Sequence, residues 1–284
     1  MELRPKLVPG DVVRLEITRS REDSRRPQMN VRSQTLVDIH VIRSGPDGFT
    51  LEWVPGRTVF DNPLVLQEPG FAAAALAVQD IRFRILLNAD GEYIGLANEA
   101  EITPKLQAAV NTIVQEAARN LPAAQRQAFQ NTVRQVLSPA VLAASATQDV
   151  QTYFGLNGAA LAPGEEVVVP LEEPNPLGGG FITSRFRVRV DSATAESAWL
   201  STTKTFHPDT LRQMTMGLLQ QAGQTIPPSE LAKMPPIQME DDGKFVFDRT
   251  LGLMRDVRTN RRITAGNATR VDGWIIRIVG VPKR

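Results

Sequence analysis

Two alternating runs and the turn between them decide the fold: TLVDIHVIR at residues 35–43, SGPDG at residues 44–48 and FTLEWV at residues 49–54. In the first run Val37, Ile39 and Val41 alternate with other residues, which is typical of a strand with one buried face. The glycines of the turn allow positive backbone φ angles. The sequence therefore predicts two long antiparallel strands joined by a hairpin.

Further strands are expected around this hairpin, at residues 11–19, 81–87 and 92–96. The last two flank Asn88-Ala89-Asp90-Gly91, a strong hairpin signal. Residues 20–28 are charged and contain Pro27, and residues 55–70 contain several prolines, so both are expected to be irregular connectors. The first third of the chain is thus predicted to be an antiparallel meander.

The middle of the chain is predicted to be helical. Ile102, Leu106, Val110 and Ile113 recur at helical spacing, and similar patterns continue to Phe154. Prolines at positions 104, 122 and 139 are expected at helix starts, where no backbone donor is needed.

The last part returns to strands, which are expected at residues 166–171, 181–191, 198–203, 244–248, 252–257 and 274–279. A helix is expected to begin at Pro208. The acidic cluster Glu240-Asp241-Asp242-Gly243 lacks the ligand spacing of a calcium loop and is expected to be a solvated hairpin turn.

Two segments share a layout. Pro9-Gly10-Asp11-Val12-Val13 resembles Pro163-Gly164-Glu165-Glu166-Val167, and each precedes a polar loop, a long alternating strand and a strand with a tryptophan, Trp53 or Trp199. An internal duplication would let both copies pair into one continuous antiparallel sheet, which curves because strands twist. We therefore expect an α+β protein with a large curved antiparallel β-sheet, half-barrel-like and covered by helices on its concave face. Residues 1–100 and 159–284 would form the two β halves, the second with one helix, and residues 101–158 a helical insert, all packed as one compact unit.

This layout resembles a family of exported bacterial proteins of unknown function and, more distantly, is similar to the outer-membrane lipoprotein carriers. The resemblance is carried by the two Pro-Gly openings and by FDRTLG at residues 247–252. The carriers have a half-open β-barrel with helices as a lid. The resemblance implies a periplasmic or otherwise exported location, although a cytoplasmic one stays open, and an apolar ligand or an envelope protein as partner.

The amino-acid composition argues against several classes of protein. The chain of 284 residues has 32 basic and 31 acidic residues, and this near-balance argues against a nucleic-acid binder. It contains no cysteine, which excludes disulfides, thiolate metal sites and thiol nucleophiles. No apolar run approaches the ~20 residues that cross a bilayer. We expect no cofactor and no bound metal.

The two histidines are weak candidates for chemistry. His40 shares a strand face with Asp38 and could act as a general base, but an ordinary strand histidine is the favoured interpretation. His207 and Asp209 could hold a metal, but two ligands are too few for a closed site, and Asp209 suits a helix N-terminus. A metal-dependent hydrolase built on these residues is the least favoured function.

Arginines 185, 187 and 189 share one face of an expected strand. They could bind an anionic group, but a solvated strand face is the favoured interpretation.

Large aromatic side chains on the expected strands could line a cavity for an acyl chain or simply fill the core. The candidate ligand-binding residues are Trp53, Phe83, Phe186, Trp199 and Phe245. We expect a non-enzymatic envelope protein that binds a lipid-like apolar ligand or a protein partner. The alternative is a structural or interaction module of a surface assembly, which predicts an exposed apolar patch.

Overall fold

A computed structural model of the chain describes residues 1–76, 79, 81–174, 181–221 and 235–281. The strands of the first half are β1 (Val12–Asp23), β2 (Val31–Gly45), β3 (Gly48–Phe60), β4 (Phe83–Leu87) and β5 (Tyr93–Leu96). Those of the second half are β6 (Glu166–Pro174), β7 (Phe181–Ala193), β8 (Ser197–Phe206), β9 (Ile237–Asp248), β10 (Leu253–Ala265) and β11 (Ala268–Gly280). The helices are α1 (Pro69–Leu76), α2 (Glu99–Ala117), α3 (Ala123–Val136), α4 (Pro139–Phe154) and α5 (Pro208–Gln221), with short 3₁₀ turns η1 (Pro27–Met29) and η2 (Pro63–Gln67).

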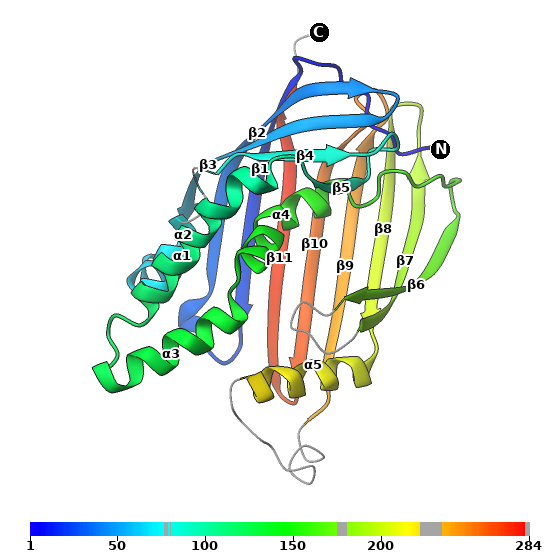
Figure 1. Ribbon diagram of the computed structural model, residues 1–284. Coiled ribbons are helices and arrows are strands. Elements are labelled where there is room, and N and C mark those ends of the chain that lie inside the picture. The colour runs from blue at the N-terminus through cyan, green and yellow to red at the C-terminus, as the bar shows by residue number, and fades with distance from the viewer. Residues whose placement is uncertain (77–78, 80, 175–180, 222–234, 282–284) are drawn as a thin grey trace.

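All of these strands form one open sheet of 11 strands in the order β5-β4-β3-β2-β1-β11-β10-β9-β8-β7-β6. Neighbouring strands are antiparallel throughout. The sheet curves into a trough, and the helices lie on its concave side (Figure 1). The predicted α+β fold with a large curved antiparallel sheet is confirmed.

Each half of the chain is a meander, and the two meanders meet where β1 pairs with β11. This ladder runs from the pair Arg14–Gly280 to the pair Asp23–Arg270. The outer strands are β5 and β6. Pro170 lies within β6, opposite Arg185 of β7. A proline is tolerated there because an edge strand has one side without a ladder.

Most strands run further than the sequence predicts. β1 enters the expected loop 20–28 as far as Asp23, and β3 enters the expected connector 55–70 as far as Phe60. The acidic residues 240–243 lie inside β9, so the expected turn there is wrong. Its Asp241 stands opposite Arg261 of β10, and this cross-strand charge pair explains why an acidic stretch fits a strand.

Helices α2 to α5 follow the predicted order, whereas α1 was not predicted and begins inside the expected connector 55–70. Ser138 caps α4 by accepting a hydrogen bond from the Val141 N–H at 3.2 Å, and Pro139 opens the helix as expected. The helix around Pro104 begins earlier than expected, at Glu99, so that proline lies inside α2.

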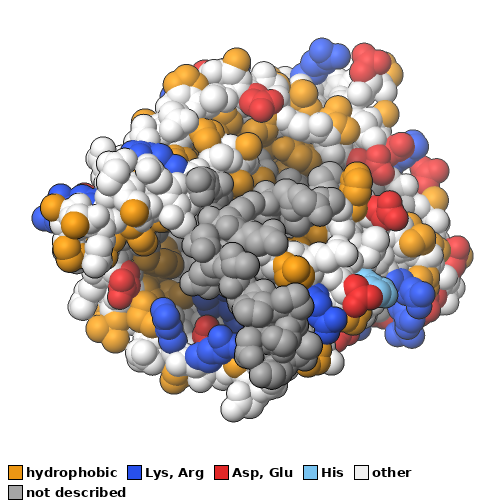
Figure 2. Space-filling view, turned by 60° about the horizontal axis from the view of Figure 1, so that its bottom comes forward, with side chains coloured by type: hydrophobic (Ala, Val, Ile, Leu, Met, Phe, Trp, Pro, Cys, Tyr) orange, Lys and Arg blue, Asp and Glu red, His pale blue; other side chains and the backbone are white. Residues whose placement is uncertain are grey.

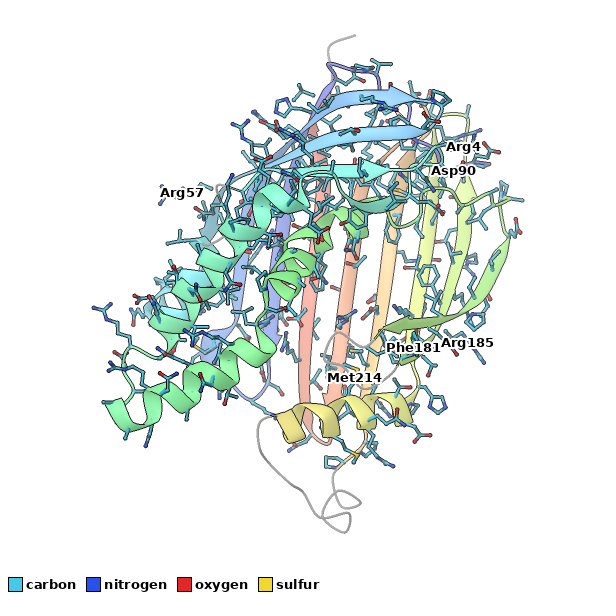
Figure 3. The ribbon with its side chains drawn as sticks, viewed as in Figure 1. Arg4, Arg57, Asp90, Phe181, Arg185 and Met214 are labelled. Carbon is cyan, nitrogen blue, oxygen red and sulfur yellow. The ribbon has the colours of Figure 1, made fainter. Side chains whose placement is uncertain are left out.

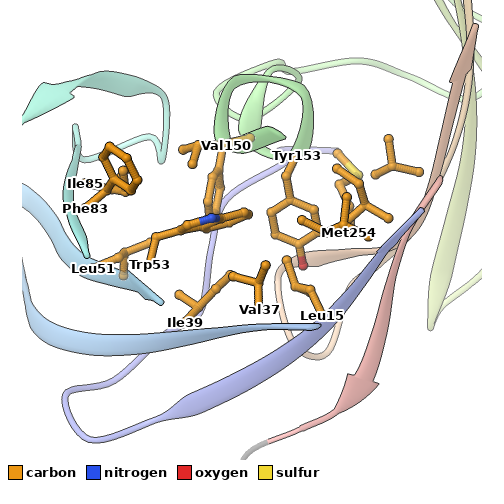
Figure 4. Close-up of a cluster of buried hydrophobic side chains, with 14 of the residues drawn as sticks. Leu15, Val37, Ile39, Leu51, Trp53, Phe83, Ile85, Val150, Tyr153 and Met254 are labelled. Atoms are coloured by element: carbon orange, nitrogen blue, oxygen red, sulfur yellow. The ribbon is translucent and has the colours of Figure 1, made fainter. Parts of the chain in front are cut away.

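The core lies between the upper part of the trough and the helices that cover it. Figure 4 shows Trp53 among Leu15, Ile39 and Val150, all of them almost fully buried. Inward positions on the strands alternate with outward ones, so every second side chain enters this core. Burial of apolar side chains against α2 and α4 therefore holds the sheet in its curved form.

The two Pro-Gly openings have the same local structure. The Gly10 N–H donates to the Val41 carbonyl, and the Gly164 N–H donates to the Val190 carbonyl, both at 2.9 Å. The acidic residue after each glycine accepts a hydrogen bond from the backbone N–H three residues before it, in the pairs Asp11–Val8 and Glu165–Ala162. The tryptophans are not equivalent, because Trp53 points into the core and Trp199 lies on the convex face with 39% of its surface exposed.

Residues 1–7 tie the upper end of the trough together. Leu3 donates its N–H to the Ala159 carbonyl at 3.0 Å, and its side chain is fully buried. The Lys6 N–H reaches the Leu251 carbonyl in the turn between β9 and β10. Arg4 forms an ion pair with Asp90 in the turn between β4 and β5, at the upper end of the trough in Figure 3. This segment therefore connects a turn of each meander.

Replacement of Leu3 by Ala should lower the free energy of unfolding by about 2–5 kcal/mol, because it leaves a cavity where the segment packs. Val8→Ala is the control, since Val8 is 50% exposed and should change stability by less than about 0.5 kcal/mol. Urea unfolding of both variants measures the difference. Equal effects of the two substitutions would contradict the packing role of residues 1–7.

Candidate functional site

The candidate site is a pocket between the concave face of β1, β2 and β3 and the helices α1 and α4. Its volume is about 420 Å³, which falls within the ~300–1,000 Å³ typical of small-molecule sites. Figure 2, in which the lower end of the molecule comes forward, shows a hollow on that face with hydrophobic side chains inside and Lys and Arg side chains beside it. The pocket lies where the helices stop filling the trough.

Aromatic rings form much of the pocket wall. Trp53 and Phe83, each 2% exposed, stand opposite each other on β3 and β4. Phe60 of β3 meets Phe71 of α1 edge to face, with 5.5 Å between ring centroids. Trp274 of β11 adds a fifth ring. These rings give a ligand apolar surface from both the sheet and α1.

One ion pair joins the sheet to α4 inside the pocket. Arg19 of β1 donates through Nε to Asp149 Oδ1 at 3.1 Å and through Nη2 to Asp149 Oδ2. Burial would lower the pKa of Arg19, but the Asp149 carboxylate outweighs it and raises that pKa, so Arg19 stays charged. Asp149 is 5% exposed, so the pair fixes α4 over the pocket with a bidentate contact.

A second group of charges lies along the pocket wall. Asp272 of β11 accepts from Arg21 Nε at 2.8 Å and lies 2.7 Å from Arg270 Nη2. Burial would raise the pKa of Asp272, but the hydrogen bonds from Arg270 and Arg21 outweigh it and hold that pKa below its usual value. Asp272 is therefore an ionised carboxylate in a nearly buried position.

The structure brings two of the predicted ligand-binding residues together, Trp53 and Phe83, both in the pocket wall. Phe186 and Phe245 lie farther along the concave face, on β7 and β9. Trp199 lies on the convex face. Alternation alone places a side chain on one face or the other, and it does not tell which face is concave.

Sequence reasoning missed Phe60, Phe71 and the charged residues of the pocket. Phe60 and Phe71 fall in or next to the stretch expected to be an irregular connector. Arg21 falls in the stretch expected to be an exposed loop. The strand alternation that begins at Val13 does continue through Arg19 and Arg21, and this was the signal that could have placed them.

The other candidates lie outside the pocket. The Asp38 carboxylate beside His40 is held by Arg14 in two hydrogen bonds of 2.7 and 2.9 Å. His207 Nδ1 is 3.7 Å from Asp209 Oδ2, and both side chains are more than half exposed. Arginines 185, 187 and 189 point to the exposed convex face. Within the described ranges, no three His, Cys, Asp or Glu side chains gather as metal ligands would.

None of the helices in the described part of the chain combines the length and hydrophobicity needed to cross a membrane.

Comparison with known proteins shows a fold relationship and no family. Neither a family model nor a curated protein matches the sequence. The structure of lipovitellin, which was determined for its lipid–protein interactions, superposes on 97% of this chain with a TM-score of 0.50 and 7% sequence identity. This chain spans 26% of that lipovitellin chain. An outer membrane channel from Pseudomonas putida F1 superposes with a TM-score of only 0.16 and 5% identity, over 96% of this chain and 97% of that one, which carries no argument.

Replacement of Asp272 by Asn should lower the free energy of unfolding at neutral pH by about 1–3 kcal/mol, because ionised Asp272 holds two arginines. A carboxyl whose pKa is lower in the folded state stabilises the fold above its unfolded pKa of about 3.9, and that stability is lost as the pH falls further. The difference between wild type and variant in urea unfolding should therefore shrink below about pH 4.

Asp47→Asn serves as the matched control, since the side chain of Asp47 is 84% exposed and the substitution should have little effect at either pH. A difference at Asp272 that stays constant with pH would contradict this role.

Proposed function

We propose that the protein binds a lipid-like apolar ligand in its trough, with the acyl chain in the pocket beneath α1 and α4. The observation that carries this proposal is the set of aromatic rings around a space of about 420 Å³. Trp53 and Phe83 form its inner wall, and Phe60 and Phe71 close it from the side of α1. A packed core would have no such space, since protein interiors contain few voids larger than a water molecule.

The wall composition supports an amphiphile over a purely apolar ligand. Arg19, Asp149, Arg21 and Asp272 lie on the same pocket as the aromatic rings. A mostly apolar pocket with a few placed polar groups is the usual form of a small-molecule site. The polar groups would orient the ligand, and the rings would supply most of its binding energy.

The likeness to lipovitellin supports the proposal at the level of the fold. Lipovitellin, whose solved structure concerns lipid–protein interactions, shares the fold with this chain. An open trough offers a lipid a long apolar surface without a closed entrance, so the architecture suits such a ligand. The lipoprotein-carrier resemblance and an exported location belong to the same proposal, and cell fractionation would test the location.

The alternative function, an interaction module, is supported by an exposed apolar surface. Leu64, Leu66 and Leu76 are exposed around η2 and α1, and a groove runs from there along α2. Under this alternative the groove would bind a protein, and lipid probes would leave the pocket empty.

Binding of a brominated ligand in the pocket should quench the fluorescence of Trp53 and Trp274. Trp53 and Trp274 line the pocket, and Trp199 lies on the convex face. Dibrominated methyl stearate, a neutral acyl probe whose bromines quench nearby indoles, should reduce the fluorescence of wild type and of Trp199→Phe. The double variant Trp53→Phe/Trp274→Phe, in which Trp199 alone remains, should show little quenching. Quenching of Trp199 alone would contradict binding at this site.

Filling the pocket should weaken binding of the same probe. Ala146 of α4 lines the pocket, so Ala146→Phe places a ring in the space of the acyl chain and should lower affinity about ten-fold or more, at ~1.4 kcal/mol per factor of ten. Ala144, on the exposed face of the same helix, provides the control Ala144→Phe, which should bind as wild type does. Equal affinities of the two variants would place the ligand elsewhere.

A further inference from the structure

A row of charged residues with alternating sign crosses the concave face below the core. Cross-strand register places Arg21 opposite Asp272, Asp272 opposite Arg261, Arg261 opposite Asp241 and Asp241 opposite Lys204. These residues, which we call the charge belt, stand on the adjacent strands β1, β11, β10, β9 and β8. The belt meets the pocket at one end, because Arg21 and Asp272 also line the pocket.

The acids of the belt lie deeper than its arginines. The side chains of Asp272 and Asp241 are 9% and 24% exposed, against 51% for Arg21 and 34% for Arg261. Two hydrogen bonds of 2.7 Å join Arg261 to Asp241, so the short carboxylates are held against the wall by longer cationic side chains. A molecule in the trough therefore meets guanidinium groups before it meets carboxylates.

The other end of the belt gathers two cations around one ring. Lys204 Nζ lies 5.1 Å from the centroid of the Phe206 ring, and the Arg261 guanidinium lies 5.7 Å from the same centroid. Asp241 stands opposite both Lys204 and Arg261, so this end of the belt also contains a carboxylate. The ring supports both cations and adds apolar surface beside them.

Arg21 donates to Asp272 through Nε, which leaves its other N–H donors for a further anion. An arginine side chain has five N–H donors in a fixed fork, so a guanidinium that holds one carboxylate can also hold a second anion. Strands in a sheet are spaced about 4.8 Å apart, so Arg21 and Arg261, two strands apart, lie about 10 Å from each other along the belt. A headgroup at the mouth of the pocket reaches Arg21 first and Arg261 next.

We propose that the ligand of the trough is an amphiphile with an anionic headgroup, a carboxylate or a phosphate, which binds on the cations of the charge belt while its acyl chain occupies the aromatic pocket. This inference rests on the proposed function and adds the chemical class of the headgroup. The same belt would disfavour a cationic amphiphile, because the outermost groups carry positive charge.

Two probes that share one acyl chain test the headgroup. Dibrominated stearate carries a carboxylate, and its methyl ester is neutral, so quenching of Trp53 and Trp274 reports both affinities. Wild type should bind the acid about ten-fold more tightly than the ester, a difference of ~1.4 kcal/mol, because charge-assisted hydrogen bonds are stronger than neutral ones. High salt should reduce this preference, because it screens exposed charges.

Variants distinguish the contribution of the charge belt to binding from the contribution of the pocket. Arg21→Gln/Arg261→Gln should bind the acid and the ester about equally tightly, and quenching by the ester shows that the variant is folded. Arg21→Lys/Arg261→Lys, which keeps both charges, should retain part of the preference. Arg258→Gln is the control, because Arg258 pairs with Asp256 on the convex face and should leave the preference unchanged.

Competition with two phosphates distinguishes a lipid headgroup from a free anion as the ligand of the charge belt. Hexadecyl phosphate should displace dibrominated stearate, and inorganic phosphate at the same concentration should not. Displacement by inorganic phosphate alone would assign the belt to a free anion and overturn the inference. Equal affinities of wild type for the acid and the ester would also overturn the inference. A preference for the acid that persists in Arg21→Gln/Arg261→Gln would overturn it as well. If neither probe quenches wild type, the proposed function fails as well.

Discussion

The architecture depends on the ladder between β1 and β11. These strands lie near opposite ends of the sequence, yet ten residues of β1, from Arg14 to Asp23, find partners on β11. Without this ladder each meander would expose an inner edge, and neither sheet would be wide enough to curve around α2 and α4. The same ladder places Arg19 and Arg21 beside Trp274 and Asp272, so the pocket is assembled by a contact between the two halves. Such long-range pairing carries a large loop-closure cost, which burial of the core must offset.

Local sequence predicted the strands well and their faces less well. Alternation at Val37, Ile39 and Val41 was enough to find β2, and the turn at Asn88 was enough to find the hairpin after β4. Whether a face is concave depends on partners across the sheet, which no local pattern contains. Trp53 and Trp199 look alike in sequence and differ in position, one in the core and one on the convex face. The acidic run at 240–243 looked like a turn because its partner, Arg261, is supplied by another strand.

The interior of the trough is divided by polarity. Above the belt most inward side chains are apolar and helices cover them. At the level of the belt they are charged and paired across strands. Five adjacent strands contribute to this belt, so its position depends on register alone. A one-residue slip in any strand would carry a belt charge to the opposite face. The register that forms the apolar core therefore also aligns the charges.

Pro170 in the outer strand β6 has a consequence for behaviour in solution. A wide sheet that does not close leaves edges on which another chain could add a strand and begin a fibril. Pro170 supplies no amide hydrogen, so an incoming strand loses a hydrogen bond in the middle of that edge. Pro170 therefore disfavours the addition of a further strand at the β6 edge of the open sheet.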